Sequence, residues 1–382
     1  MSSAQSSRSV FRPSLDWLLI FVPVAFALRY VPGWRHETAL FLVSALALIP
    51  VAGWMGKATE HLAHRMGEGI GGLLNASFGN AAELIIALMA LRAGRLEVVK
   101  ASITGSIVGN LLLVLGVSVF AGGLRYPRQT FNKTGVRASC TALILAAAAL
   151  VIPGVFHHTA AQRPGGWSPA AEQSLSLVIA CVLIATYAAI LVFSLVTHRQ
   201  LFRGGEADIG SHDKSDGAAE APWSIGKAVG VLLVATATVA WVSEFLVGAV
   251  EAAQHSLGVT ETFVGVIIVA IVGNAAEHST AVTMALKNKM DLAFGIAVGS
   301  SLQIALFVAP VLVFASYLFP YRLSLEFTMP EIVAVVTAVF VADQISGDGE
   351  SNWLEGVQLL ALYAILAVLF YFLPAMSEAA AP

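Results

Sequence analysis

The motif Gly79-Asn80-Ala81-Ala82-Glu83 recurs 194 residues later as Gly273-Asn274-Ala275-Ala276-Glu277, and this repeat decides the fold. At the same offset, Gly105-Ser106 recurs as Gly299-Ser300, with no insertion or deletion between the two motifs. Only eight of the 31 aligned positions are identical, and all eight carry small or polar residues. Shared apolar composition would not produce such identities by chance, so the chain contains two diverged copies of one unit.

The composition excludes most other classes of protein. Of the 382 residues, 12% are charged and 57% are hydrophobic, and the mean hydropathy is +0.80. An ordinary soluble chain carries about 25% charged residues. Disorder requires low hydrophobicity, and a soluble domain of this size could not hide so much apolar surface. The net charge of −3 gives no reason to expect nucleic acid as a partner. A polytopic membrane protein therefore remains.

Eleven apolar runs are long enough to cross a bilayer, which requires about 20 residues in a helix. The runs are continuously apolar rather than alternating, so a β-barrel is disfavoured. They comprise residues 15–33, 38–56, 70–91, 98–121, 136–156, 173–197, 226–250, 260–286, 291–318, 327–345 and 353–374. The expected fold is an all-α integral membrane protein with about 11 transmembrane helices.

The basic residues predict how this bundle lies in the membrane. Fourteen Lys and Arg fall on the side of the N-terminus and seven on the other side. The positive-inside rule then predicts a cytoplasmic N-terminus and, with eleven spans, a C-terminus on the opposite side. Short loops and an Ala-rich composition favour a bacterial inner membrane, with a vacuolar membrane as the alternative.

The repeat also predicts how the chain is divided. Its two copies are five spans apart, and an odd number of spans places the second copy upside down relative to the first. Inverted repeats with Gly-interrupted helices are typical of secondary transporters whose site lies near the midplane. The expected segments are an N-terminal segment with the first span (1–36), a first five-helix repeat (37–197), a polar cytoplasmic linker (198–224) and a second five-helix repeat (225–382).

Two carboxylates occupy matching positions in the two copies. A carboxylate inside the membrane is costly and is by default a functional candidate. Glu83 and Glu277 would face each other across the pseudo-two-fold axis. Two close carboxylates cannot both stay ionised without a cation, and otherwise at least one binds a proton. The pair therefore predicts a site that holds either a cation or protons.

The residues around this pair narrow the choice of cation. Neutral oxygen donors accompany the carboxylates, and Ca²⁺ prefers a shell of six to eight oxygens. Mg²⁺ fits less well because it keeps its waters, and Zn²⁺ or Cu would require more His or Cys. The predicted metal ligands, besides the carboxylates, are Asn80, Asn274, Ser106, Ser300 and Gln303, with Ser301 and Asn110 as further donors.

These motifs resemble a known family. Two Gly-Asn-Ala-Ala-Glu motifs, each followed after about 22 residues by Gly-Ser, resemble the α-repeats of the calcium/cation antiporter superfamily. The form Gly-Asn-Ala-Ala-Glu-His at 273–278, with Gly-Ser-Ser-Leu-Gln at 299–303, is similar to the cation/proton exchanger (CAX) branch. The resemblance covers the whole transmembrane part of the chain, including the extra first span and the polar linker.

The resemblance implies Ca²⁺/H⁺ antiport, with Glu83 and Glu277 as carriers of metal and protons. It further implies that His278 and Gln303 act near the site. Ala-Ala precedes each Glu, whereas the sodium/calcium exchanger branch carries a Pro-containing or Thr-Ser motif there, which argues against Na⁺ coupling. Residues 198–224 are less acidic than the corresponding helix of some relatives, which weakens the case for cation regulation and favours a solvated linker.

Several of these residues also have a purely structural interpretation. The two Asn residues could serve as interhelical hydrogen-bonding groups, and the two Ser residues as small packing residues. His278 could relay protons or make a structural hydrogen bond. Gln303 is matched by Gly109 and Asn110 by Ile304, so the two halves of the site cannot be identical.

Four residues are candidates for an access path or gate. Glu244 and Glu251 are seven residues apart and so share a helix face. His61 and His255 are matched at the repeat offset, which favours a role at a mouth of the transporter. The cluster Glu60-His61-Leu62-Ala63-His64 does not have the His-Glu-x-x-His order of zinc proteases.

The predicted function is export of Ca²⁺ from the cytoplasm in exchange for H⁺ by alternating access. A related exchanger with other coupling or metal, such as Mn²⁺/H⁺ or Na⁺/Ca²⁺, is the alternative. An intramembrane enzyme and a passive channel are disfavoured. The expected partners are Ca²⁺, H⁺ and the lipid bilayer, with Ca²⁺ as transported substrate and no cofactor.

Overall fold

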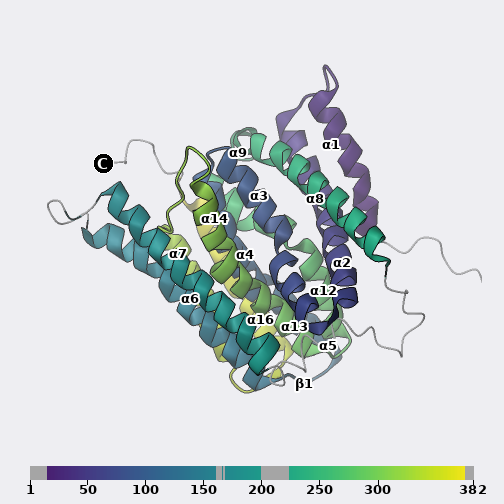
Figure 1. Ribbon diagram of the computed structural model, residues 1–382, viewed down its shortest axis with the longest axis vertical. Helices are drawn as coiled ribbons and strands as arrows, with labels where there is room; N and C mark the ends of the chain where they lie inside the picture. Colours follow the sequence, from purple (N-terminus) through teal and green to yellow (C-terminus); the bar gives the residue numbers. More distant parts are fainter. Residues whose placement is uncertain (1–14, 161–165, 167, 199–222, 375–382) are drawn as a thin grey trace, which may run out of the picture.

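Helices form along the apolar runs of the sequence (Figure 1). The structure is a computed structural model that describes residues 15–160, 166, 168–198 and 223–374. In the first half, the elements are η1 (Leu15–Ile20), α1 (Phe21–Tyr30), α2 (Glu37–Phe78), α3 (Ala81–Arg92), α4 (Leu96–Val108), η2 (Gly109–Val114), α5 (Leu115–Arg125), β1 (Gln129–Thr130), α6 (Lys133–Ala160), α7 (Pro169–Val192) and η3 (Phe193–Thr197). Here η1 is a 3₁₀ helix, whereas η2 and η3 are π-helical turns.

The second half also consists of helices, with one short strand. They are α8 (Ile225–Gly248), α9 (Val250–Leu257), α10 (Glu261–Phe263), η5 (Val264–Val269), α11 (Ala270–Gly273), α12 (Ala275–Leu286), α13 (Met290–Gln303), η6 (Ile304–Val308), α14 (Ala309–Ser316), α15 (Met329–Ile345), β2 (Glu350–Ser351) and α16 (Trp353–Phe372). Again η5 and η6 are π-helical turns. The predicted linker 198–224 lies almost entirely outside the described residues.

The number of spans that meet a length criterion is smaller than predicted. Among the described residues, seven helices are long and apolar enough to cross a membrane, and an eighth forms if α9 and the helix that begins at α10, bent by 108°, are one span. The prediction of 11 spans is therefore not confirmed as a count. Helices α1, α3 and α15 have only 10, 12 and 17 residues.

Helix α2 corrects one predicted boundary. The sequence predicts two spans, 38–56 and 70–91, with a connection between them, but α2 continues without interruption for 42 residues to Phe78. Residues 57–66 include Lys, Glu, Leu, Arg and Met, which are good helix formers, and no Pro. Their charges indicate exposure to water, but they do not end the helix.

Both repeat motifs break a helix at the same position. The backbone leaves the helical conformation at Asn80 (φ −99°, ψ 29°) and at Asn274 (φ −91°, ψ 4°). New helices begin at Ala81 and Ala275, and each runs for 12 residues. The predicted spans 70–91 and 260–286 are thus discontinuous helices, as the Gly-Asn sequence indicated.

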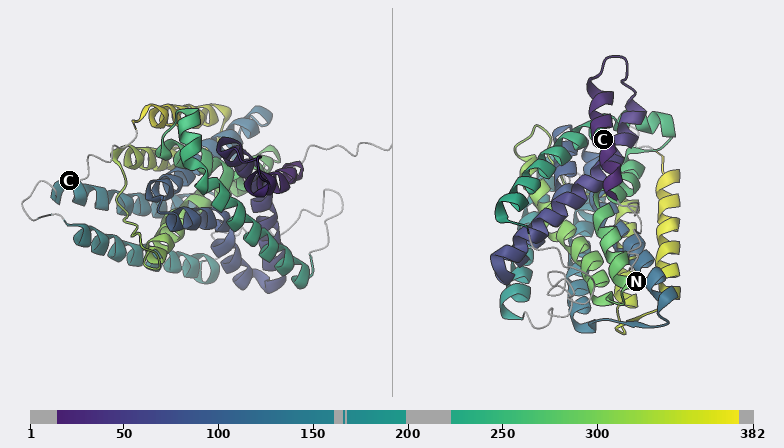
Figure 2. Two further views of the ribbon diagram at one scale, coloured as in Figure 1. Left: turned by 90° about the horizontal axis from the view of Figure 1, so that it is seen from above. Right: turned by 90° about the vertical axis from the view of Figure 1, so that its right-hand side faces the viewer.

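Many contacts between a helix of one half and a helix of the other occur twice, once with the roles of the two halves reversed. Helix α3 packs against α8 and α14, and its counterpart α12 packs against α2 and α5. Likewise, α5 packs against α16, and α14 packs against α7. Helices α6 and α7 lie at one edge of the molecule and α1 at the opposite edge (Figures 1 and 2). The repeat units therefore meet along the middle of the molecule.

Several connections between helices meet at one end of the bundle. There, β1 pairs antiparallel with β2, and Gln129 donates hydrogen bonds to the Ala285 carbonyl and to Asn288. These contacts join the connections after α5, α12 and α15. The eleven-span prediction places these three connections on the same side of the membrane. The contacts between them agree with that prediction.

Candidate cation site

A network of polar side chains crosses from one half to the other beside the two helix breaks. The Ser300 hydroxyl donates to Asn80 Oδ1 at 2.6 Å, and Asn274 Nδ2 donates to Ser106 Oγ at 3.1 Å. Asn110 Nδ2 connects the two pairs, since it lies 3.0 Å from Ser300 Oγ and 3.3 Å from Asn274 Oδ1. All five residues are buried. Both halves thus contribute to one continuous cluster.

Gln303 joins this network from the second half. Asn80 Nδ2 donates to Gln303 Oε1 at 2.5 Å. A Cβ atom built on Gly79 would lie 3.3 Å from the same oxygen, so the absence of a side chain at Gly79 lets Gln303 approach the break. The predicted donors Asn80, Ser300 and Gln303 are therefore in direct contact.

The two carboxylates lie in the first turns of the helices that follow the breaks. Glu83 Oε2 and Glu277 Oε2 are both buried, and neither has a hydrogen-bond partner. The Glu83 side chain reaches the opposite half, because a Cβ atom built on Gly273 would lie 3.2 Å from Glu83 Cγ. Carboxylates with buried, unpartnered oxygens require a compensating cation or protons.

The local backbone explains why these groups meet. Each Asn ends one helix and precedes another, so helix ends with unpaired backbone groups point into the same region. The facing helices α4 and α13 each lead into a π-helical turn, η2 or η6, and such turns occur often at functional sites. Asn110 lies within η2, and Gln303 immediately precedes η6. The two halves thus present different side chains from matching turns.

His278 directly follows Glu277. Its Nε2 atom is buried and has no hydrogen-bond partner. A structural hydrogen bond from this atom, the alternative interpretation, is therefore not formed in this structure.

The donors favour a hard cation over a soft one. The described residues contain no group of three or more His, Cys, Asp and Glu side chains that could hold a metal ion. A cation between Glu83 and Glu277 would consequently take most of its ligands from amide and hydroxyl oxygens. That set resembles the oxygen shell of Ca²⁺ and lacks the nitrogen and sulfur ligands typical of Zn²⁺.

The four residues predicted to form an access path lie outside this network. Glu251 is exposed and pairs with Arg95 at 2.8 Å, and Glu244 and His255 are also exposed. His61 stacks on Trp223, with ring centroids 4.4 Å apart. The access and gate roles of these residues stay predictions.

Arg95 is a residue that the sequence analysis did not single out. Its guanidinium also pairs with Glu261 at 2.6 Å, so it ties the turn between α3 and α4 to the bend between α9 and α10. The hydrogen bond to Glu251 and the charge of Glu261 raise the pKa of Arg95. The arginine therefore holds the two halves together at one end of the bundle.

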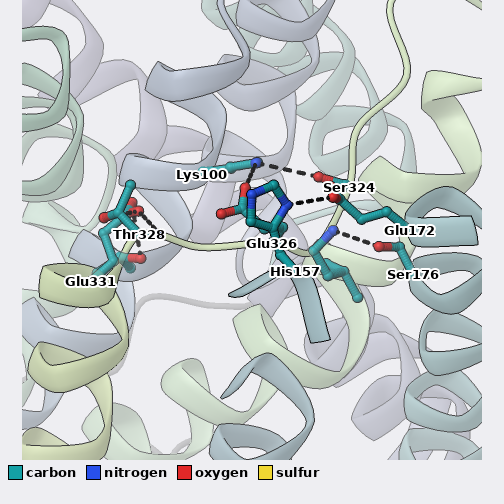
Figure 3. Close-up of polar contacts among 10 residues, drawn as sticks. Lys100, His157, Glu172, Ser176, Ser324, Glu326, Thr328 and Glu331 are labelled. Atoms are coloured by element: carbon teal, nitrogen blue, oxygen red, sulfur yellow. Dashed lines mark hydrogen bonds and ion pairs between the residues drawn. The ribbon is translucent and has the colours of Figure 1, made fainter. Parts of the chain in front are cut away.

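A second polar cluster, shown in Figure 3, was also not predicted. Lys100 pairs with Glu326 at 3.1 Å, and His157 pairs with Glu172 at 2.8 Å. Nearby, Glu331 is only 2% exposed and accepts a hydrogen bond from the Thr328 hydroxyl. The segment between α14 and α15 connects these groups. Nothing in the sequence pattern brings them together, since their partners lie up to 226 residues apart.

Comparisons with known proteins identify the family. The sequence model of the sodium/calcium exchanger protein family matches residues 36–196 and 227–372. A Ca²⁺/H⁺ antiporter of Aphanothece halophytica is 46% identical over 369 residues, covering 94% of this chain and 97% of that protein. The Ca²⁺/H⁺ antiporter ChaA of Bacillus subtilis (strain 168) is 50% identical over 357 residues, covering 93% and 98%. The chain belongs to the cation/proton exchanger (CAX) family.

A solved structure gives the same family at the level of the fold. The structure of native YfkE superimposes with a TM-score of 0.79 and 44% sequence identity, covering 94% of this CAX chain and all of YfkE. Its coverage and those of the two relatives extend over both halves. The resemblance predicted from the two short motifs is thus confirmed, and the chain is an integral membrane protein of a transporter family.

Proposed function

We propose that this CAX family member exchanges Ca²⁺ for H⁺ by alternating access, with Glu83 and Glu277 as the shared binding site for both ions. The observation that carries the proposal is the pair of buried carboxylate oxygens without hydrogen-bond partners. Two relatives described above are each named Ca²⁺/H⁺ antiporter, which supports the choice of Ca²⁺ and H⁺ as substrates.

The site would coordinate Ca²⁺ mainly with oxygen ligands from both halves. Glu83 and Glu277 would supply the negative charge, and the oxygens of Asn80, Asn274 and the nearby hydroxyls would complete the shell. Backbone carbonyl groups at the breaks that end α2 and α11 would add further ligands. Binding would require the present hydrogen bonds of the network to rearrange around the ion.

Protons would release the ion by competing for the same two carboxylates. On the acidic side of the membrane, protonation removes both negative charges, and Ca²⁺ loses its main ligands. The neutral site can then return to the other side. Two carboxylates accommodate two protons per Ca²⁺, and a third proton on His278 would make the exchange electrogenic. His278 directly follows Glu277 in the second motif, and this position is the observation that motivates a third proton site.

The proposed architecture is an extra N-terminal helix followed by two inverted five-helix repeats. The paired contacts of α3 and α12 support this arrangement. With a more acidic compartment on the side opposite the cytoplasm, the proton gradient would drive Ca²⁺ export. Bacterial relatives favour a bacterial plasma membrane as the location.

Ca²⁺ uptake into proteoliposomes under an imposed pH gradient tests the coupling. An acidic interior should drive Ca²⁺ inward, and a Na⁺ gradient alone should not. Uptake that follows the Na⁺ gradient and ignores the pH gradient would show that the coupling ion is wrong. A competition series with Mn²⁺ in the same assay would show whether another divalent ion is the preferred substrate.

A further inference from the structure

An apolar groove lies between α1, α2 and α8, and none of its lining residues belongs to the network of the cation site. The ribbon views show these three helices side by side (Figures 1 and 2). Its volume of about 500 Å³ falls in the range of ligand-binding pockets. Its walls are Leu19, Val22, Pro23, Val51, Trp54, Gly230, Val231, Val234, Ala235 and Thr238. Only the Trp54 indole and the Thr238 hydroxyl among these side chains carry a polar atom. The groove therefore suits a long apolar ligand.

Gly230 keeps this groove open. A Cβ atom built on Gly230 would meet no other atom within 4 Å. A larger residue at this position would therefore project into open space instead of into a neighbouring helix. The groove depends on a missing side chain, in contrast to the tight glycine contacts elsewhere in the bundle.

Two lysines stand at the end of the groove where Trp54 lies. Lys57 follows Trp54 by three residues on α2, and Lys227 precedes Gly230 by three residues on α8, so each lies one helical turn from a wall residue. Both lysines are exposed, and neither forms an ion pair within the described part of the chain. Their charges are thus available to an anionic group.

Aromatic rings hold this end in a fixed arrangement. Lys57 Nζ lies 5.3 Å from the centre of the Trp54 ring, and Lys227 Nζ lies 4.3 Å from that of Trp223. The two indoles stack with centroids 5.9 Å apart, and His61 stacks on Trp223. Asp16 accepts a hydrogen bond from Trp54 Nε1 at 2.9 Å. Tryptophan and lysine together are typical of the level of lipid headgroups.

We propose that this groove is a binding site for one anionic phospholipid. An acyl chain would occupy the apolar walls, and the phosphate group would lie between Lys57 and Lys227. Charge complementarity selects this occupant: a neutral apolar ligand would leave the two ammonium groups unused. The positive-inside prediction places these lysines in the cytoplasmic leaflet, where anionic lipids are concentrated.

Titration of the detergent-purified full chain with phosphatidylglycerol or phosphatidylcholine, followed by native mass spectrometry, tests the proposal. We expect saturable binding of one phosphatidylglycerol with clear preference over phosphatidylcholine. The double variant Lys57→Gln with Lys227→Gln should bind phosphatidylglycerol about thirtyfold more weakly. Gly230→Leu should prevent binding of this lipid by filling the groove.

Matched variants separate a specific site from general lipid contact. Lys133→Gln with Lys287→Gln removes two exposed lysines elsewhere, and Gly226→Leu adds a side chain at another open glycine of α8 that does not line the groove. Both controls should bind as the wild type does. Equal binding of the two lipids, or equal loss in test and control variants, would overturn the proposal.

Fluorescence provides a second measurement that does not depend on the lysine and glycine variants. Phosphatidylglycerol brominated in its acyl chains should quench Trp54, measured as the difference between the wild type and Trp54→Phe. Brominated phosphatidylcholine at the same concentration should quench Trp54 much less. Equal quenching by both lipids would also overturn the proposal. Neither measurement involves transport, so its outcome is independent of the proposed exchange activity.

Discussion

At the scale of single residues, the proposed cation site depends on Glu83 and Glu277. Each carries a buried carboxylate oxygen without a partner. Glu83→Gln or Glu277→Gln removes one negative charge while it keeps the volume of the side chain. We expect either variant to abolish Ca²⁺ transport in proteoliposomes, with Glu37→Gln, a change at the start of α2 that lies outside the hydrogen-bond network of the site, as the control. A variant that transports at a near-normal rate would remove that residue from the site.

The pH dependence of Ca²⁺ binding follows from the same two groups. In the proposed mechanism protons and Ca²⁺ compete for the carboxylates, so the dissociation constant for Ca²⁺ should rise as the pH falls. If binding displaces two protons, the constant changes by up to about 100-fold per pH unit in the range where both carboxyls are protonated. Titration calorimetry in buffers of different ionisation enthalpy counts the protons released. An affinity that does not change with pH would contradict a shared site.

Sequence reasoning selected the candidate ligands but could not give their arrangement. The offset of 194 residues was sufficient to select Glu83 and Glu277. The repeat could not show that Asn110 joins the two halves. The residue that matches Asn110 in the second half is Ile304, so comparing the two copies does not single out Asn110. Asymmetric contacts of this kind depend on the three-dimensional packing of η2 against α13.

At the scale of elements, two glycines at equivalent positions have different surroundings. A Cβ atom on Gly105 would clash with the carbonyl of Val266, so α4 and η5 can approach only without a side chain there. A Cβ atom on its counterpart Gly299 would meet nothing within 4 Å. Gly105→Ala should therefore destabilise the protein by about 1–3 kcal/mol through overpacking.

Gly299→Ala is the matched control for this change. Alanine favours a helix over glycine by up to about 1 kcal/mol, so Gly299→Ala should leave stability unchanged or raise it slightly. Thermal unfolding of both variants in the same detergent measures the difference. Equal melting temperatures would contradict the close approach of α4 and η5.

The element boundaries show where sequence reasoning was reliable. The Gly-Asn pairs predicted both helix breaks because glycine and asparagine tolerate a non-helical backbone. The charges between 57 and 69 suggested a connection that is absent, since charged residues with high helix propensity can extend a helix into water. The bend at Gly258, with φ of 69°, lies between the predicted spans 226–250 and 260–286.

At the scale of the whole molecule, the orientation in the membrane can be tested with single cysteines. Cys181 is exposed and would be replaced by Ser, whereas Cys140 is buried. The positive-inside prediction requires a cysteine at Lys287 to react with an impermeant thiol reagent from the cytoplasmic side. A cysteine at Leu318, beyond α14, should react only from the opposite side. The reverse pattern would show that the molecule is inserted the other way.

The different side chains at Asn110 and Gln303 bear on the energetics of transport. In an exchanger built from two identical inverted halves, the inward-open and outward-open forms would be equally stable. Here the first half places Asn110 where the second has Ile304, and the second half places Gln303 where the first has Gly109. These differences remove the degeneracy. Changes at these two positions can therefore shift the equilibrium between the inward-open and outward-open forms. The proposed ion-binding carboxylates need not change for this to happen.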